Sequence, residues 1–155
     1  MFHGGGLWLT DGSVTITSST IVENDVLDGT TAGGIMVATF GAPVDVTIQN
    51  SIVAGNGLYD CQVEGGAAAV LTSLGNNVFG DDSCGSATGD QTSTDPLIGP
   101  LADNGGPTLT HALQAGSPAI DAANADACSA TDQRGVARPQ GAGCDVGAYE
   151  DDSGS

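Results

Sequence analysis

The sequence predicts an all-β protein in which short parallel strands stack on one another as a parallel β-helix. A repeat carries this prediction: residues 14–24, VTITSSTIVEN, are similar to residues 46–56, VTIQNSIVAGN. Within both copies apolar residues alternate with threonine, the pattern of a strand with one buried face. Glycine, with 25 residues, and asparagine suit the tight corners between such strands. Copies too short to bury their own apolar faces are expected to stack along an axis.

The repeat extends beyond these two copies. Residues 5–9, GGLWL, align with residues 33–37, GGIMV, and residues 69–80 form a third, weaker copy. We align the pair IV at residue 21 with the pair IV at residue 52, which shortens the offset between copies from 32 to 31. Residues 1–80 are therefore predicted to form coils whose strands lie about 4.8 Å apart.

The second half, residues 81–155, is predicted to be an irregular cap that belongs to the same structural domain. Residues 80–96 are polar and are expected to form a loop. Residues 95–123 contain apolar islands between Gly-Pro and Ser-Pro turns, which favours short irregular strands. Residues 124–143 are predicted to be loop, and residues 145–150 are predicted to form a last strand.

Charge excludes two classes of partner. The formal net charge is −17, because 19 acidic residues face only two basic ones. A nucleic-acid binder needs a basic surface to displace counterions, so no nucleic-acid partner is expected. No apolar run approaches the roughly 20 residues that span a bilayer, so membrane insertion is not expected.

The four cysteines predict two disulfides. None lies in a CxxC pair, and only two histidines accompany them, which argues against zinc or iron–sulfur ligation. Of the three pairings, we expect Cys61–Cys84 and Cys128–Cys144, which join nearest neighbours along the chain. Disulfides indicate an extracellular or cell-surface location. The N-terminus, MFHGGGLWLT, is no signal peptide, so we expect the chain to be a fragment of a longer protein.

Short sequence motifs in the second half resemble those of a known family. They are DPLIGPLADNGGPT from residue 95, GSPAID from residue 116, DQRG from residue 132 and CDVGAYE from residue 144. They are similar to the C-terminal signature of the choice-of-anchor Q bacterial surface proteins, within the wider group of polymorphic outer-membrane-protein-like β-helices. The resemblance implies a right-handed parallel β-helix that is secreted or attached to a surface. It supplies no catalytic residue.

Paired carboxylates keep an enzyme hypothesis open. Glycoside hydrolases on β-helices work through such pairs, but an acid-rich chain produces pairs by chance. A lyase is the weaker alternative, because the chain has no lysine to act as base and its charge repels acidic polysaccharides. His111 lies in an apolar context and is expected to be structural. The candidate pairs are Asp81/Asp82, Asp90/Asp95, Asp121/Asp126 and Asp145/Glu150.

Two polar loops could supply a calcium site. Asp81, Asp82, Asp90 and Asp95 offer carboxylates beside hydroxyl and carbonyl oxygens, the ligands that Ca²⁺ prefers. Neither loop has the pattern of an EF-hand. The alternative is a hydrated acidic surface, and no other cofactor is expected.

Arg134 is expected to hold the closing segment. We predict an ion pair between Arg134 and Asp145 or Glu150, which would tie the last loop over the open end of the stacked strands. The alternative role for Arg134 is to bind the carboxylate of a ligand.

The first coil is expected to associate with another molecule. Its strand would present unpaired backbone groups, which are a template for a further strand. We therefore predict a non-enzymatic structural or adhesive surface module that self-associates or binds a surface glycan, with an extracellular fibre subunit as an alternative. The predicted edge consists of Gly4, Gly5, Gly6, Leu7, Trp8 and Leu9.

Overall fold

The computed structural model describes residues 5–26 and 31–152 and confirms the all-β class. Two short 3-10 helices, Gly66–Ala68 and Ala125–Ala127, interrupt the strands. No described helix has the length and apolarity needed to cross a bilayer. The strands are β1 (Leu7–Leu9), β2 (Gly12–Thr17), β3 (Thr20–Val22), β4 (Ile35–Ala38), β5 (Val44–Gln49), β6 (Ile52–Ala54), β7 (Cys61–Glu64), β8 (Ala69–Ser73), β9 (Val78–Phe79), β10 (Ile98–Ala102) and β11 (Thr110–Leu113).

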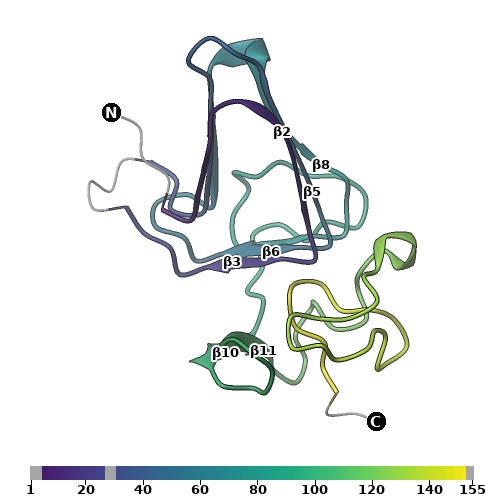
Figure 1. Ribbon diagram of the computed structural model, residues 1–155. Helices are drawn as coiled ribbons and strands as arrows, with labels where there is room; N and C mark the ends of the chain where they lie inside the picture. Colours follow the sequence, from purple (N-terminus) through teal and green to yellow (C-terminus); the bar gives the residue numbers. More distant parts are fainter. Residues whose placement is uncertain (1–4, 27–30, 153–155) are drawn as a thin grey trace.

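The first nine strands form three parallel sheets, ordered β1-β4-β7, β2-β5-β8 and β3-β6-β9. The chain visits each sheet in turn and does so three times, so we call β1–β3, β4–β6 and β7–β9 the first, second and third pass. In Figure 1 the passes overlie one another, with β2, β5 and β8 along one side and β3 and β6 along the next.

The register follows the repeat, with one correction. Leu7 lies opposite Ile35, as the GGLWL and GGIMV alignment predicts. Ile21, however, lies opposite Val53, so the expected shortening of the offset after residue 20 is wrong. The offset stays at 32 because hydrogen bonding between the passes, rather than identity of side chains, sets the register.

Glycine pairs allow the passes to approach closely beside the first sheet. A Cβ on Gly6 would lie 2.9 Å from the carbonyl oxygen of Gly34, and a Cβ on Gly34 would lie 2.4 Å from that of Asp60. Real Cβ atoms do not tolerate such distances, so both repeats need glycine there.

Alternate side chains of the strands point into one apolar core. In β5, Val44, Val46 and Ile48 are buried, whereas Asp45 is exposed. The second pass is covered from both sides, so its inward residues are almost fully buried. In the first pass Ile16 is buried, but the other inward residues are only partly buried; they include Leu7, Leu9, Val14 and Ile21.

A loop covers the outer edge of the third pass. Phe79 donates its backbone N–H to the Gln91 carbonyl, and Thr94 donates to the Phe79 carbonyl. Asn76 donates to the Thr88 carbonyl in the same way. Residues 81–94 thus take the place of a further strand. Among the described residues, β1, β2 and β3 pair with a strand on one side only.

The rest of the second half packs against the side of the stack and not over its end, which corrects the predicted cap. The antiparallel hairpin β10–β11 and the C-terminal segment lie beside β3 and β6 in Figure 1. Outward-facing Ile52 and Val78 form a second apolar cluster with Leu113, Val146 and Tyr149. Residues 145–150 form bends rather than the predicted strand, because their backbone groups bond to loops on several sides.

Candidate functional site: a cleft between the stack and its closing segment

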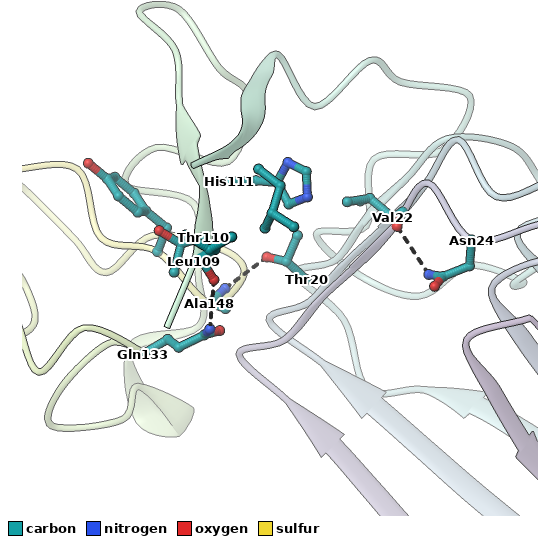
Figure 2. A pocket seen from close by; sticks show the side chains of 10 residues that line it. Thr20, Val22, Asn24, Leu109, Thr110, His111, Gln133 and Ala148 are labelled. Atoms are coloured by element: carbon teal, nitrogen blue, oxygen red, sulfur yellow. Dashed lines mark hydrogen bonds between the residues drawn. The ribbon is translucent and has the colours of Figure 1, made fainter. Parts of the chain in front are cut away.

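A cleft of about 210 Å³ separates β3 from the β10–β11 hairpin and the C-terminal segment. Three regions far apart in the sequence meet there because the closing segment docks on the outer face of β3-β6-β9. Figure 2 shows His111 on the hairpin and Thr20 and Val22 on β3 around the same space. The cleft is lined by Thr20, Val22, Asn24, Leu101, Leu109, Thr110, His111, Gln133, Ala148 and Tyr149.

Backbone contacts fix the polar groups of the cleft. The Ala148 N–H donates to Thr20 Oγ1 at 3.0 Å, which leaves the Thr20 hydroxyl proton free to donate. His111 Nδ1 lies 2.9 Å from the Gly99 carbonyl oxygen. A carbonyl can only accept, so Nδ1 donates in this contact. Gln133 Nε2 donates to Thr108 Oγ1 at 2.8 Å.

A second, more open hollow of about 440 Å³ adjoins the first. The two share Thr20, Gln133 and Ala148. The second hollow adds hydroxyl groups, while half-exposed Leu101 and Leu109 line the first. Apart from Asp132 and Arg138, each of which is held in an ion pair, the polar groups of the two hollows are uncharged hydroxyl, amide and imidazole groups. Such groups beside apolar side chains suit a neutral polar ligand. The further residues of the second hollow are Thr17, Ser18, Ser19, Ser129, Thr131, Asp132 and Arg138.

Arg134 is buried and organises the wall behind the cleft. Its Nε lies 2.9 Å from Asp132 Oδ2, and its guanidinium carbon lies 3.7 Å from the centre of the Tyr149 ring. An Nη2–H donates to the Glu150 backbone carbonyl at 2.5 Å. Arg134 therefore holds both the loop that contains Asp132 and the final segment, and it fixes the ring that lines the cleft.

The predicted partner of Arg134 is wrong. Its nearest carboxylate partner is Asp132, two residues away, rather than Asp145 or Glu150. The side chain does reach the C-terminal residues, through the backbone carbonyl of Glu150 and through a longer contact of 3.9 Å between Nη1 and the Asp152 carboxylate. The turn of Asp132 places its carboxylate against both the backbone N–H and the side chain of Arg134, which makes the local pair favourable.

Arg138 contacts Asp145 and Glu150, the two residues that the sequence predicted as partners of Arg134. Its side chain is 1% exposed, and Nη1 lies 3.4 Å from Glu150 Oε2. It also donates to the backbone carbonyls of Asp145, at 2.6 Å, and Gly147, at 2.7 Å. The Glu150 carboxylate in turn accepts from the N–H groups of Gln140 and Asp145. Sequence reasoning missed this role, for which the only signal was a second arginine in an arginine-poor chain.

The acidic residues considered for calcium or catalysis hold the backbone in place. Asp60 and Asp81 exchange hydrogen bonds, each carboxylate accepting the other's backbone N–H at 3.1 and 3.0 Å. Asp90 accepts from the N–H groups of Asn77 and Ala87. Asp82 accepts from Ser93, and Asp95 accepts from the Leu97 N–H. Within residues 5–26 and 31–152, no three His, Cys, Asp or Glu residues gather as a metal site.

Burial and hydrogen bonding shift the pKa values of three carboxylates in different directions. Burial raises the pKa of Asp60, with the Asp81 charge adding to it, and burial likewise raises the pKa of Asp145. Burial also acts on Asp132, but the N–H donors of Glu150, Arg134 and Val136 outweigh it, so its pKa lies below the usual value. The fold therefore favours protonated Asp60 and Asp145 but ionised Asp132.

This difference predicts a stability maximum in mild acid. Asp60 and Asp145 have raised pKa values, so their contribution is present at low pH and lost as pH rises through those values. The contribution of Asp132 is present above about pH 4 and lost as pH falls through its lowered pKa. We expect the urea midpoint to rise from pH 7 toward pH 4 and to fall below it. Asp132→Asn should remove the fall, and a midpoint that declines steadily from pH 7 would contradict the assignment.

The disulfides join the predicted partners. Cys61 bonds Cys84 and Cys128 bonds Cys144, with Cα–Cα distances of 4.9 and 6.2 Å. The first links β7 to the loop that covers the third pass. The second links the loop after the 3-10 helix Ala125–Ala127 to the final segment.

The predicted self-association edge lies in β1 and the residues before it. Gly4 is outside the described residues, and Gly5 and Gly6 are exposed. Leu7 and Leu9 point to the core, whereas Trp8 is 45% exposed and meets the Phe40 ring edge-on at 6.3 Å. Nothing in the structure tests whether this edge binds a partner, so the edge stays a prediction.

The comparisons leave the family open. No protein-family model, curated protein or solved structure matches the chain. The resemblance of the words in the second half to surface β-helix proteins therefore remains a prediction.

Proposed function

We propose that the chain is a right-handed parallel β-helix module that serves outside the cell as a non-enzymatic structural or adhesive unit. The observation that carries the proposal is the threefold return of the chain to the same three parallel sheets, in register. Repeated passes of this kind build an elongated scaffold with exposed faces. The resemblance of residues 144–150 and the other second-half motifs to surface proteins supports the right-handed coil and the location outside the cell.

Cysteine and charge support the extracellular setting. Both disulfides are compatible with an oxidising compartment. The net charge of −17 keeps such modules apart in solution and makes anionic partners unfavourable. A neutral partner is therefore favoured.

The use of the acidic residues supports a structural role. Asp60, Asp81 and Asp90 each accept backbone N–H groups, and Asp132 and Glu150 pair with the two arginines. Carboxylates bound in this way position loops and are held in one geometry. A general acid, in contrast, must be able to exchange a proton with the substrate, so these contacts favour a structural role.

The cleft supports the adhesive role. Hydroxyl and amide groups and the His111 ring beside Leu101 and Leu109 offer the mixed lining that a neutral saccharide requires. We propose that a neutral surface glycan binds there.

Retention on immobilised polysaccharides tests this function. We expect the protein to be retained by a neutral polysaccharide and to release neither reducing ends nor unsaturated sugars from it. Leu101→Asp places a charge in the cleft and should abolish retention. Leu74→Asp is the matched control, because Leu74 is 50% exposed and Leu101 is 54% exposed, but only Leu101 lines the cleft. Product release by the wild-type protein would contradict the non-enzymatic assignment, and equal retention of both variants would exclude the cleft.

A further inference from the structure

A short linker joins the stack to the second half of the chain and is held at both of its ends. On the stack side, the Thr94 N–H donates to the Phe79 carbonyl of the third pass at 3.0 Å. Two residues later, the Pro96 carbonyl accepts a hydrogen bond from Ser117 Oγ at 2.6 Å. Pro96 and Ser117 are both buried in the part that packs beside the stack. The peptide bond before Pro96 therefore lies between two anchored points.

Leu97, directly after this linker, has an unusual backbone conformation. Its φ is 48°, in the left-handed region that residues with a Cβ rarely adopt. Among the described non-glycine residues with positive φ, Leu97 is the only apolar one. The Gln114 N–H holds the Leu97 carbonyl at 2.9 Å, yet the side chain is 38% exposed, so its burial does not compensate for the strain. Strained backbone of this kind clusters at functional sites.

The Asp95 carboxylate folds over the peptide bond that follows it. Asp95 Oδ1 accepts the Leu97 N–H at 2.9 Å, so the carboxylate bridges the peptide between these two residues. Asp95 is exposed, and its Oδ2 has no hydrogen-bond partner within residues 5–26 and 31–152. Oδ2 is thus a nucleophile that is held beside the carbonyl carbon of its own residue, where water can reach the carboxylate. Such fixed placement lowers the entropic cost of an intramolecular attack.

Proline makes this bond more susceptible to such an attack than the other bonds that follow an aspartate. The proline nitrogen carries no hydrogen, and as a tertiary amide nitrogen it is the more basic leaving group. The sequence contains a single Asp-Pro pair, at residues 95 and 96. The nucleophile, the favourable leaving group and the strained backbone therefore coincide at one place in the chain.

We propose that the protein cleaves its own chain between Asp95 and Pro96. Asp95 Oδ2 attacks the Asp95 carbonyl carbon and closes a cyclic anhydride, the bond from that carbon to the Pro96 nitrogen breaks, and the nitrogen takes a proton from the solvent. Water then opens the anhydride, which restores the Asp95 side chain and creates a new C-terminal carboxylate. The reaction consumes a single water molecule and occurs once per chain, so it is self-processing and not turnover of a substrate.

Cleavage leaves no covalent link between the two halves. The Cys61–Cys84 disulfide lies wholly before the bond, and the Cys128–Cys144 disulfide lies wholly after it. In the native protein the halves stay together through the second apolar cluster, to which both contribute. Self-processing thus converts the closing segment into a separate chain that is held by non-covalent contacts alone.

Incubation of the pure folded protein in mild acid, which supplies the proton for the leaving nitrogen, tests the proposal. We expect chains of residues 1–95 and 96–155, whose masses sum to that of the intact chain plus water. Denaturing electrophoresis without reductant separates them, because no disulfide spans the bond. Cleavage should be roughly tenfold faster, or more, than in the same protein unfolded in urea and in a peptide of residues 90–101, because only the fold holds the carboxylate in place.

Variants locate the reacting groups. Asp95→Ala removes the nucleophile and should abolish cleavage. Asp103→Ala is the matched control, because Asp103 is also exposed and accepts the N–H of the residue two positions later, but no proline follows it. Ser117→Ala releases the Pro96 carbonyl and should slow cleavage severalfold in the folded protein but not in the unfolded one, which identifies Ser117 as a positioning residue. Absence of cleavage, cleavage at another bond, or equal rates in the folded and unfolded protein overturns the inference.

Discussion

Replacing Arg138 by methionine is expected to destabilise the protein by about 3–5 kcal/mol, because the change leaves a buried carboxylate without its cation. The side chains of Arg138 and Glu150 are 1% and 0% exposed, so water cannot take over the interaction. The same side chain holds the Asp145 and Gly147 carbonyls. Its Nε is buried without a partner, a cost that the other contacts outweigh.

A double variant distinguishes the energetic contribution of the ion pair from that of side-chain packing. Arg138→Met combined with Glu150→Gln removes both charges and should recover part of the loss. Urea unfolding at neutral pH measures both variants. A loss below about 0.5 kcal/mol, the range of an ordinary surface change, would show that Arg138 does not hold the segment.

Removing the Cys61–Cys84 disulfide should cost about 3 kcal/mol in the loop-entropy model, since the bond joins residues 23 apart. Replacing both cysteines by alanine also leaves small cavities, because Cys61 and Cys84 are 2% and 3% exposed and belong to the main core. Fraying should begin at the loop over the third pass, whose Ser83 and Asp81 contacts depend on this staple.

The other disulfide is the matched comparison. Cys128 and Cys144 are 16 residues apart, and Cys128 is only half-buried, so the corresponding double alanine variant should lose less. Thermal unfolding of the two variants ranks them. A larger loss for the Cys128–Cys144 variant would contradict the placement of Cys61–Cys84 in the core.

The repeated passes could be predicted because local pattern and long-range pairing agree there. Val14 and Ile16 lie opposite Val46 and Ile48, as the repeat of VTI indicates. The alignment is wrong at Ile21 because similarity of side chains matched it to Ile52, whereas it pairs with Val53. The hydrogen bond from the Ser19 N–H to Ser51 Oγ is consistent with that register. Identity of residues cannot reveal such a bond.

The closing segment could not be placed from the sequence, because its contacts are set by three-dimensional proximity. Asp132, two residues from Arg134, forms the close ion pair with it. The Glu150 carboxylate pairs instead with Arg138. The cleft escaped prediction for the same reason. Thr20, His111 and Ala148 are brought together only when the hairpin docks on the outer face of β3-β6-β9.

The central claim, that three passes stack in register with the second between the other two, is tested most directly by residue-resolved hydrogen exchange of the free protein. Strands β5 and β6 have partners on both sides, whereas β2 and β3 have a described strand partner on one side only. The stack predicts that the amides of Val46 and Ile48 exchange far more slowly than those of Val14 and Ile16. Exchange of Val46 and Ile48 as fast as that of Val14 and Ile16 would contradict the stack.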